Sequence, residues 1–174
     1  MKKYISPSLA MTTFIGLFLA SCTHSNMQPI EDDYVNNEWE LFPASETTVS
    51  DSTVSTADFS PTQFQTIELP ATVLSGLRQN GQFEDIYYNK GLEKIDPAPF
   101  QNPWWYRKEL VLDNPDSGTH HQLILEGINY KAELWINGQE VSRDQPMEGA
   151  FGIYHYQITP FISKGKNIIA VKVS

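Results

Sequence analysis

The dipeptide Asn137-Gly138 constrains the fold of this chain more than any other feature of the sequence. Both residues tolerate the positive backbone φ angles of a type I′ turn, whose twist matches that of two antiparallel strands. Before it, residues 130–136 alternate between a face of Tyr, Ala, Leu and Ile and a face of Lys, Glu and Trp, the period of a strand with one buried face. The pattern predicts a β-hairpin in which residues 139–141 return along residues 134–136.

Other short alternating segments predict a mostly β structure. Strands are expected at residues 37–42, 105–112, 122–126, 151–158 and 169–173, and one short helix starts near Val73 and ends at Asn80-Gly81. Residues 44–62 are compatible with a linker or with a strand that has long loops. We favour the strand because the apolar residues Val49 and Val54 would have nothing to pack against in a pure linker. Short strands between turn signals, with almost no helix, predict an all-β jelly-roll β-sandwich.

Residues 83–102 predict a long surface loop because Gly91, Pro97 and Pro99 interrupt any regular pattern. Long ordered loops in compact domains are often functional.

The N-terminal residues predict a secretory leader. Lys2 and Lys3 precede an apolar run at residues 9–19, which is shorter than the roughly 20 residues that span a bilayer. The run ends in Leu19-Ala-Ser-Cys22, which resembles the lipobox of bacterial lipoproteins, and Cys22 is the only cysteine and so has no internal disulfide partner. The alternative is an ordinary secretory signal cut nearby.

This interpretation divides the chain into three parts. They are a lipoprotein signal peptide at residues 1–22, a polar tether at 23–36 and one folded domain at 37–174. We expect lipidation of Cys22 to anchor the protein to the bacterial cell envelope, and Thr23, rather than Asp, after the cysteine points by the same resemblance to the outer membrane.

The charge of the chain argues against a nucleic-acid partner. The sequence has 21 acidic residues against 12 Lys and Arg, and no basic cluster, so a phosphate backbone would be repelled. The sequence is also rich in aromatic residues, with eight Tyr, nine Phe and four Trp, which suits either a sandwich core or a sugar-binding surface.

No catalytic or metal site emerges from residue types and spacing. Glu109 and Glu133 fall on polar strand faces, where a solvated carboxylate is ordinary. The pair His120-His121 would point to opposite faces of a strand, with no third ligand in register. The remaining candidates by type alone are Glu126, Glu140 and Glu148. We therefore predict no catalytic residue, no metal and no cofactor.

Three residues are candidate sugar contacts, namely Trp135, Trp104 and Asn137. Aromatic rings stack on the apolar faces of sugars, but a large aromatic side chain in a sandwich strand, here including Trp105, is more often part of the core. Trp135 is the weakest core candidate because it shares its strand face with Lys131 and Glu133. Asn137 could bind sugar hydroxyls, although its role in the turn explains it fully.

Five segments of the sequence match a known family in order and spacing. They are Leu69-Pro-Ala-Thr-Val-Leu74, Asn102-Pro-Trp-Trp-Tyr-Arg107, Glu126-Gly-Ile-Asn-Tyr-Lys-Ala-Glu-Leu-Trp-Ile-Asn-Gly138, Gly149-Ala-Phe151 and Gly165-Lys-Asn-Ile-Ile-Ala-Val171. In these segments the chain resembles the amino-terminal, galactose-binding-like sugar-binding domain of family 2 glycoside hydrolases, from about residue 37 to the end. The Pro-Trp-Trp-Tyr-Arg stretch is most similar to the exo-β-glucosaminidase and β-mannosidase branch.

The resemblance implies a domain without its own hydrolytic machinery. Family members are retaining β-glycosidases, of exo-β-glucosaminidase, β-mannosidase or β-galactosidase type, whose catalytic carboxylates lie on a (β/α)₈ barrel that this sequence does not match. By that resemblance the sandwich lacks its last strands, and its partners are β-linked glycans and the missing catalytic barrel. Two alternatives stay open: a free-standing carbohydrate-binding lipoprotein of the cell surface, and a non-functional remnant.

Overall fold

The structure is a computed structural model that describes residues 38–83, 86–113, 115 and 120–174. The predicted leader, lipidation site and tether lie outside the described residues, and the three-part division of the chain stays a prediction. Within the described residues, no helix is long and apolar enough to cross a membrane.

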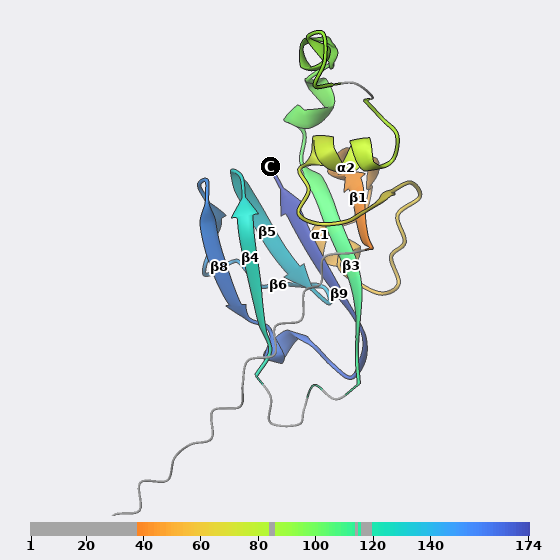
Figure 1. Cartoon of the computed structure of the whole chain (residues 1–174). Helices are drawn as coiled ribbons and strands as arrows, with labels where there is room; N and C mark the ends of the chain where they lie inside the picture. The colour runs from red at the N-terminus through yellow and green to blue at the C-terminus, as the bar shows by residue number, and fades with distance from the viewer. Residues whose placement is uncertain (1–37, 84–85, 114, 116–119) are drawn as a thin grey trace, which may run out of the picture. The chain divides into compact units, whose positions relative to one another are not determined.

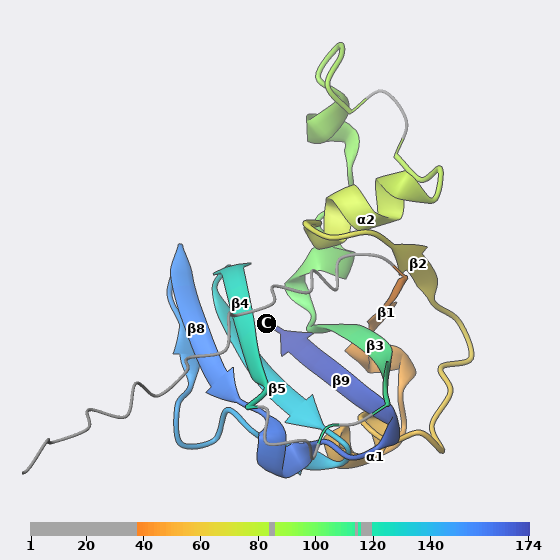
Figure 2. The same ribbon diagram turned by 60° about the horizontal axis from the view of Figure 1, so that its bottom comes forward.

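The described strands form two antiparallel sheets (Figure 1). The larger sheet has the order β2 (Gln65–Ile67), β1 (Trp39–Pro43), β3 (Trp104–Leu112), β9 (Gly165–Val173), β5 (Lys131–Ile136) and β6 (Gln139–Glu140), with β7 (Met147–Glu148) also paired to β5. The smaller sheet pairs β4 (Gln122–Ile128) with β8 (Gly152–Gln157). Figure 2 shows the smaller sheet beside one face of the larger one, here called the inner face. The predicted all-β sandwich is confirmed.

The central hairpin has the predicted geometry. Asn137 and Gly138 adopt φ angles of 47° and 84°, so both lie in the left-handed region that a type I′ turn requires. The register pairs Trp135 with Glu140 and Ile136 with Gln139. The backbone N–H of Val141 then donates to the carbonyl of Leu134 at 2.8 Å, so the return continues beyond β6.

The main core lies on the inner face. Alternate residues of β5, Ala132, Leu134 and Ile136, are fully buried there, as the period of two predicts. They pair with the inner residues Val173, Val171 and Ile169 of β9. Tyr156 of β8 and Trp104 of β3 belong to the same cluster, so side chains from both sheets build it.

A second, smaller core covers the outer face of the large sheet. Residues 44–62, for which we predicted a strand with long loops, instead contain a short 3₁₀ helix η1 (Ala44–Glu46) and a short helix α1 (Asp51–Val54) and no strand. Val54 packs against Phe42, Trp105 and Ala170, whereas Val49 is partly exposed. The prediction was wrong because Val54 packs on the outer face while the carbonyls of the segment accept from the Arg107 side chain, so the segment does not pair as a strand.

Arg107 of β3 fixes that segment in place. Its buried guanidinium donates to three main-chain carbonyls, Val54 at 3.0 Å, Thr56 at 3.0 Å and Phe59 at 2.9 Å. It also forms a salt bridge with Glu40 of β1. One side chain therefore ties three carbonyls of this segment to β3 and β1.

Helix α2 (Val73–Gln79) begins and ends near the predicted residues. The hydroxyl of Thr72 caps its first turn by accepting from the N–H of Ser75, and Asn80 is its C-cap. A Cβ atom on Gly76 would lie 2.8 Å from a methyl group of Leu41, so the helix can approach β1 only because this position is glycine. Further 3₁₀ helices are η2 (Gly91–Lys94), η3 (Ala98–Gln101) and η4 (Thr159–Phe161).

Two local predictions differ from the structure. Tyr130 was placed on the buried face of the hairpin strand, but β5 begins at Lys131 and the Tyr130 side chain is exposed. The last strand was expected at residues 169–173, but β9 already begins at Gly165, which pairs with Leu112. In both places the first residue of the strand is set by backbone pairing with a strand distant in sequence. The spacing of apolar residues along the chain does not predict such pairing.

Candidate functional site

The segment between α2 and β3, residues 83–102, is an arm that projects from the sandwich (Figures 1 and 2). Apart from η2 and η3 its described residues form turns and loops, as the Pro and Gly positions predict. The arm is joined to the body through Phe83, whose ring packs against Phe100 with 6.0 Å between ring centroids, and both rings contact the main core.

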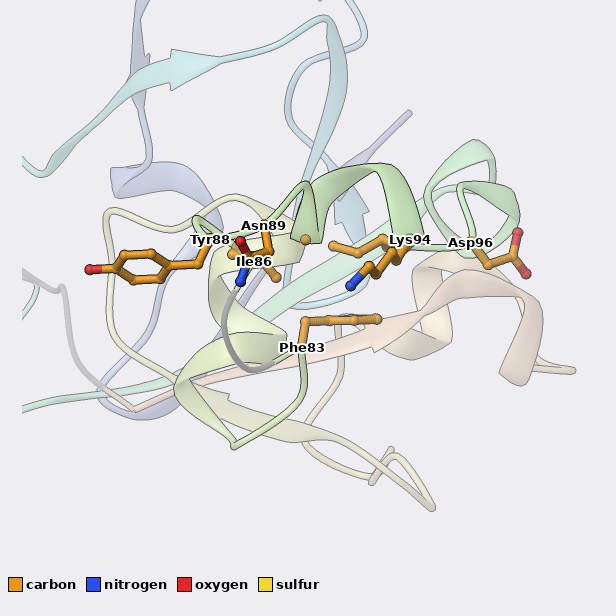
Figure 3. A pocket seen from close by; sticks show the side chains of 8 residues that line it. Phe83, Ile86, Tyr88, Asn89, Lys94 and Asp96 are labelled. Atoms are coloured by element: carbon orange, nitrogen blue, oxygen red, sulfur yellow. The ribbon is translucent and has the colours of Figure 1, made fainter.

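Residues of the arm line a half-open cavity of about 530 Å³ (Figure 3). Its lining is formed by Phe83, Ile86, Tyr88, Asn89, Gly91, Lys94, Ile95 and Asp96. In Figure 3 the Lys94 side chain extends alongside the ring of Phe83, while the Tyr88 ring points outward on one side and the Asp96 carboxylate on the other. The volume lies within the usual range of small-ligand sites, about 300 to 1,000 Å³.

A tight turn presents Tyr88 at the rim. Asn89 and Lys90 both adopt left-handed backbone conformations, with φ of 46° and 59°, and the N–H of Gly91 donates to the Tyr88 carbonyl at 2.8 Å. Tyr88 is 72% exposed. A positive φ costs free energy at residues other than glycine, so the turn holds the ring outward at some expense of stability.

The polar groups of the cavity have hydrogen-bonding capacity to spare. Within the described part of the chain, no ion-pair partner is found for the Lys94 ammonium. One oxygen of Asp96 accepts from the N–H of Ala98 at 3.0 Å, which leaves its other oxygen as an acceptor. Aromatic surface next to a few polar groups is a usual composition of a small-molecule site.

The three predicted sugar contacts are not brought together in a cavity. Trp104 is buried on the inner face, and its indole N–H donates to the carbonyl of Pro99 at 2.9 Å. Trp135 is half-buried on the outer face, where it packs against the smaller core. Their role as sugar contacts stays a prediction, but the placement favours the core role for both tryptophans.

The Asn137 side chain is fully used inside the fold. Its amide NH₂ donates to the Phe161 carbonyl and to the Asn167 side chain, both at 2.8 Å, and its oxygen accepts from the N–H of Ile168 at 2.9 Å. Asn137 therefore ties the hairpin turn to η4 and to β9, and it has no spare donor to offer a sugar hydroxyl.

Most candidate carboxylates are held in surface ion pairs. Glu109 pairs with Lys166 at 2.7 Å, Glu140 with Arg143 at 3.0 Å and Glu148 with Lys131 at 3.6 Å. These pairs lie on separate strands and loops and do not form a facing pair of carboxylates. Across the described residues, no three His, Cys, Asp or Glu side chains gather in a way that could hold a metal ion.

The residues that line the arm cavity were not predicted individually. The sequence predicted only that residues 83–102 form a long loop, of a kind that is often functional. The signal was the run Tyr87-Tyr88-Asn89, in which exposed aromatic residues adjoin a turn-forming residue. In the structure the Tyr87 ring lies 5.4 Å from the guanidinium carbon of Arg78 on α2.

Comparison with known proteins gives a consistent result. The model of the family described as glycosyl hydrolase 2 galactose-binding domain-like matches residues 46–174. An exo-β-D-glucosaminidase of Amycolatopsis orientalis is 34% identical over 123 residues, which are 71% of this chain and 12% of that enzyme. An exo-β-D-glucosaminidase of Streptomyces avermitilis is 29% identical over 103 residues, 59% of this chain and 11% of that enzyme. The chain thus spans only a small fraction of the length of these relatives.

Solved structures agree on the fold. The crystal structure of an Amycolatopsis orientalis exo-chitosanase matches with a TM-score of 0.71 and 30% identity, over 79% of this chain and 16% of that one. A β-D-mannosidase from Dictyoglomus thermophilum matches with a TM-score of 0.62 and 17% identity, over 80% of this chain and 15% of that one. At that identity the second match shows the fold alone.

Proposed function

Since the chain belongs to the galactose-binding domain-like family of glycosyl hydrolase 2, we propose that it is the N-terminal carbohydrate-binding domain of a β-glycosidase of exo-β-glucosaminidase type. On its own it binds β-linked glycans and does not cleave them. The ligand class follows from the names of the relatives, exo-β-D-glucosaminidase and exo-chitosanase, and the net charge of −9 favours a cationic amino-sugar chain.

The arm cavity is the observation that carries this proposal. It combines aromatic surface from Phe83 and Tyr88 with an amide from Asn89, an ammonium from Lys94 and a carboxylate from Asp96. Sugars present apolar C–H faces and hydroxyl rims, so a ring with adjacent donors and acceptors matches both. Three of the five candidate carboxylates outside the arm, Glu109, Glu140 and Glu148, are paired with cations on the surface of the sandwich, which supports binding rather than hydrolysis.

Isothermal titration with β-linked glucosamine oligomers tests the proposal. The full chain should show saturable binding, and Tyr88→Ala should weaken it because the exposed ring is lost while the fold is kept. Val111→Ala is the matched control, since Val111 is 62% exposed on β3 and lies outside the arm. Absence of heat at millimolar oligomer, or equal binding by Tyr88→Ala, would reject glycan binding at this cavity.

The inactivity of the chain alone is tested separately. Incubation with a chromogenic β-glucosaminide should release no product above the buffer rate. Robust hydrolysis by the purified chain would show that reactive carboxylates lie within these 174 residues.

We also propose that the protein is anchored to the cell envelope through a lipid on Cys22. This proposal is supported by the sequence alone, through the segment Leu19-Ala-Ser-Cys22 and the absence of a second cysteine. A domain of this kind would then hold glycans at the surface of the cell.

A further inference from the structure

Arg78, in the last turn of α2, contacts the middle of the arm. Its guanidinium carbon lies 5.4 Å from the centre of the Tyr87 ring, in a cation–π contact that we call the latch. Tyr87 is 70% exposed, so its ring gains little free energy from burial. The position of this ring therefore depends largely on the cation that lies over it.

The end of α2 that carries Arg78 is firmly fixed. The side chain of the next residue, Gln79, accepts from the N–H of Glu68 at 2.8 Å and donates to the Glu68 carbonyl at 2.9 Å. The side-chain amide of Asn80 donates to the Thr66 carbonyl of β2 at 2.9 Å. Arg78 therefore reaches the arm from a rigid support and not from another loop.

Tyr87 lies between two residues that line the arm cavity. Ile86 and Tyr88 belong to the lining, whereas Tyr87 does not. Ile86 is buried and Tyr88 is exposed at the rim, and the hydrogen bond from Gly91 to the Tyr88 carbonyl closes the turn that follows. Because consecutive Cα atoms are held about 3.8 Å apart, a displacement of Tyr87 moves both lining residues with it.

The base of the arm is held independently of the latch. The rings of Phe83 and Phe100 pack on one another near the two ends of the arm and also contact the main core. The indole N–H of Trp104 donates to the Pro99 carbonyl at 2.9 Å. Loss of the Arg78 contact should therefore loosen the middle of the arm and leave the sandwich intact.

We propose that Arg78 is a positioning residue for the arm cavity. Its guanidinium holds the Tyr87 ring beside α2 and thereby keeps Ile86 and Tyr88 in the arrangement that binds a β-linked glycan. Arg78 acts by raising the fraction of molecules whose arm is in place before the ligand arrives, and the apparent Kd varies inversely with that fraction. The proposal rests on the proposed function, which supplies the ligand.

A double-variant cycle tests the latch without any ligand. Endoproteinase Lys-C cleaves after lysine, so Arg78→Ala and Tyr87→Ser neither add nor remove a site, and native-state cleavage at the exposed Lys90 and Lys94 reports opening of the arm. Each single variant should be cleaved there about two- to fivefold faster than the unaltered chain, the effect of one cation–π contact at an exposed site. The double variant should be cleaved no faster than either single variant, because both changes remove the same contact.

Titration with a β-linked glucosamine oligomer tests the link between the latch and the cavity. Arg78→Ala and Tyr87→Ser should each raise the Kd by about two- to fivefold. Tyr87→Phe keeps the ring and should behave as the unaltered chain, and Arg78→Lys keeps the cation and should restore part of the affinity. Arg143→Ala is the matched control, since it removes an arginine whose side chain is 73% exposed outside the arm. All variants should melt within about 3 °C of the unaltered chain, because each change is at the surface.

The two measurements separate the possible failures. Unchanged cleavage of both single variants, or effects that add in the double variant, overturns the latch whether or not a glycan binds. Faster cleavage with an unchanged Kd overturns the role of Arg78 in binding. Absence of binding by the unaltered chain rejects the proposed function and that role together, while the cleavage rates still decide whether the latch exists.

Discussion

Replacement of Arg107 by methionine should be among the most damaging single changes in this domain. Methionine has a similar length but no charge and no donor. Only 6% of the Arg107 side chain is exposed, and the guanidinium is the common partner of the carbonyls of Val54, Thr56 and Phe59 and of the Glu40 carboxylate.

The magnitude follows from those contacts. Removing one partner of a buried ion pair leaves an uncompensated charge and costs about 3 to 5 kcal/mol. The three carbonyls lose charge-assisted hydrogen bonds, although water reaches some of them once the segment loosens. We therefore expect a loss of about 4 kcal/mol, a large part of the roughly 5 to 15 kcal/mol that a domain has, and a melting temperature lower by about 12 °C.

Urea unfolding followed by tryptophan fluorescence measures this loss, because Trp105 and Trp135 lie in the outer core that the segment covers. Arg107→Lys keeps the charge but cannot fork to several carbonyls, and it should lose about 2 kcal/mol. Arg143→Met is the control, since its side chain is 73% exposed and its pair with Glu140 should contribute less than about 1 kcal/mol. A loss below about 1 kcal/mol for Arg107→Met would refute the conclusion that Arg107 holds residues 54–59 on the sheet.

Three further predictions concern the turn, the core and the leader. Asn137→Gly keeps the left-handed turn but removes the three side-chain hydrogen bonds, whereas Asn137→Ala removes them and also adds backbone strain. Thermal melting should show the Asn137→Gly variant to be more stable than the Asn137→Ala variant by about 1 kcal/mol. Equal stability of the two variants would contradict the turn geometry. Burial raises the pKa of the Tyr106 phenol above its usual value, so its contribution to stability is complete below about pH 10 and is lost as the pH rises further. Tyr106→Phe loses the hydrogen bond to the Ala71 carbonyl at pH 7. Between about pH 9 and 11 the free energy of unfolding of this variant, measured in urea, should fall less than that of the unaltered chain. Parallel curves of unfolding free energy against pH would argue against a raised pKa of Tyr106. Cys22→Ser should abolish labelling with a radioactive fatty acid in a bacterial host, whereas unchanged labelling would exclude the lipobox.

The parts of the fold that could be predicted are those fixed by local chemistry. The hairpin at Asn137 follows from two residues that accept positive φ, and the buried face of β5 follows from a period of two. Helix α2 follows from the helical spacing of Val73, Leu74 and Leu77 and from an Asn-Gly end. In each place the determining residues are within about ten positions of one another.

The parts that could not be predicted depend on contacts between distant residues. The segment 44–59 is polar and rich in Ser and Thr, and its position depends on hydrogen bonds from Arg107 across 48 to 53 residues of sequence. The arm cavity depends on how Phe83 and Phe100 anchor two ends of an irregular loop. The position of Trp135 in a second core could not be predicted, because Lys131 and Glu133 on the same strand face indicate an exposed surface. Only the folded structure shows that α1 covers this face.

The most direct test of the account is the mapping of amide chemical shifts in the full chain on addition of a β-linked glucosamine oligomer. Binding at the arm predicts that the largest changes occur at the described residues of 83–96, including Phe83, Asn89 and Lys94, with little change at the hairpin around Asn137. No change anywhere, or changes centred on Trp135 and Asn137, would contradict it.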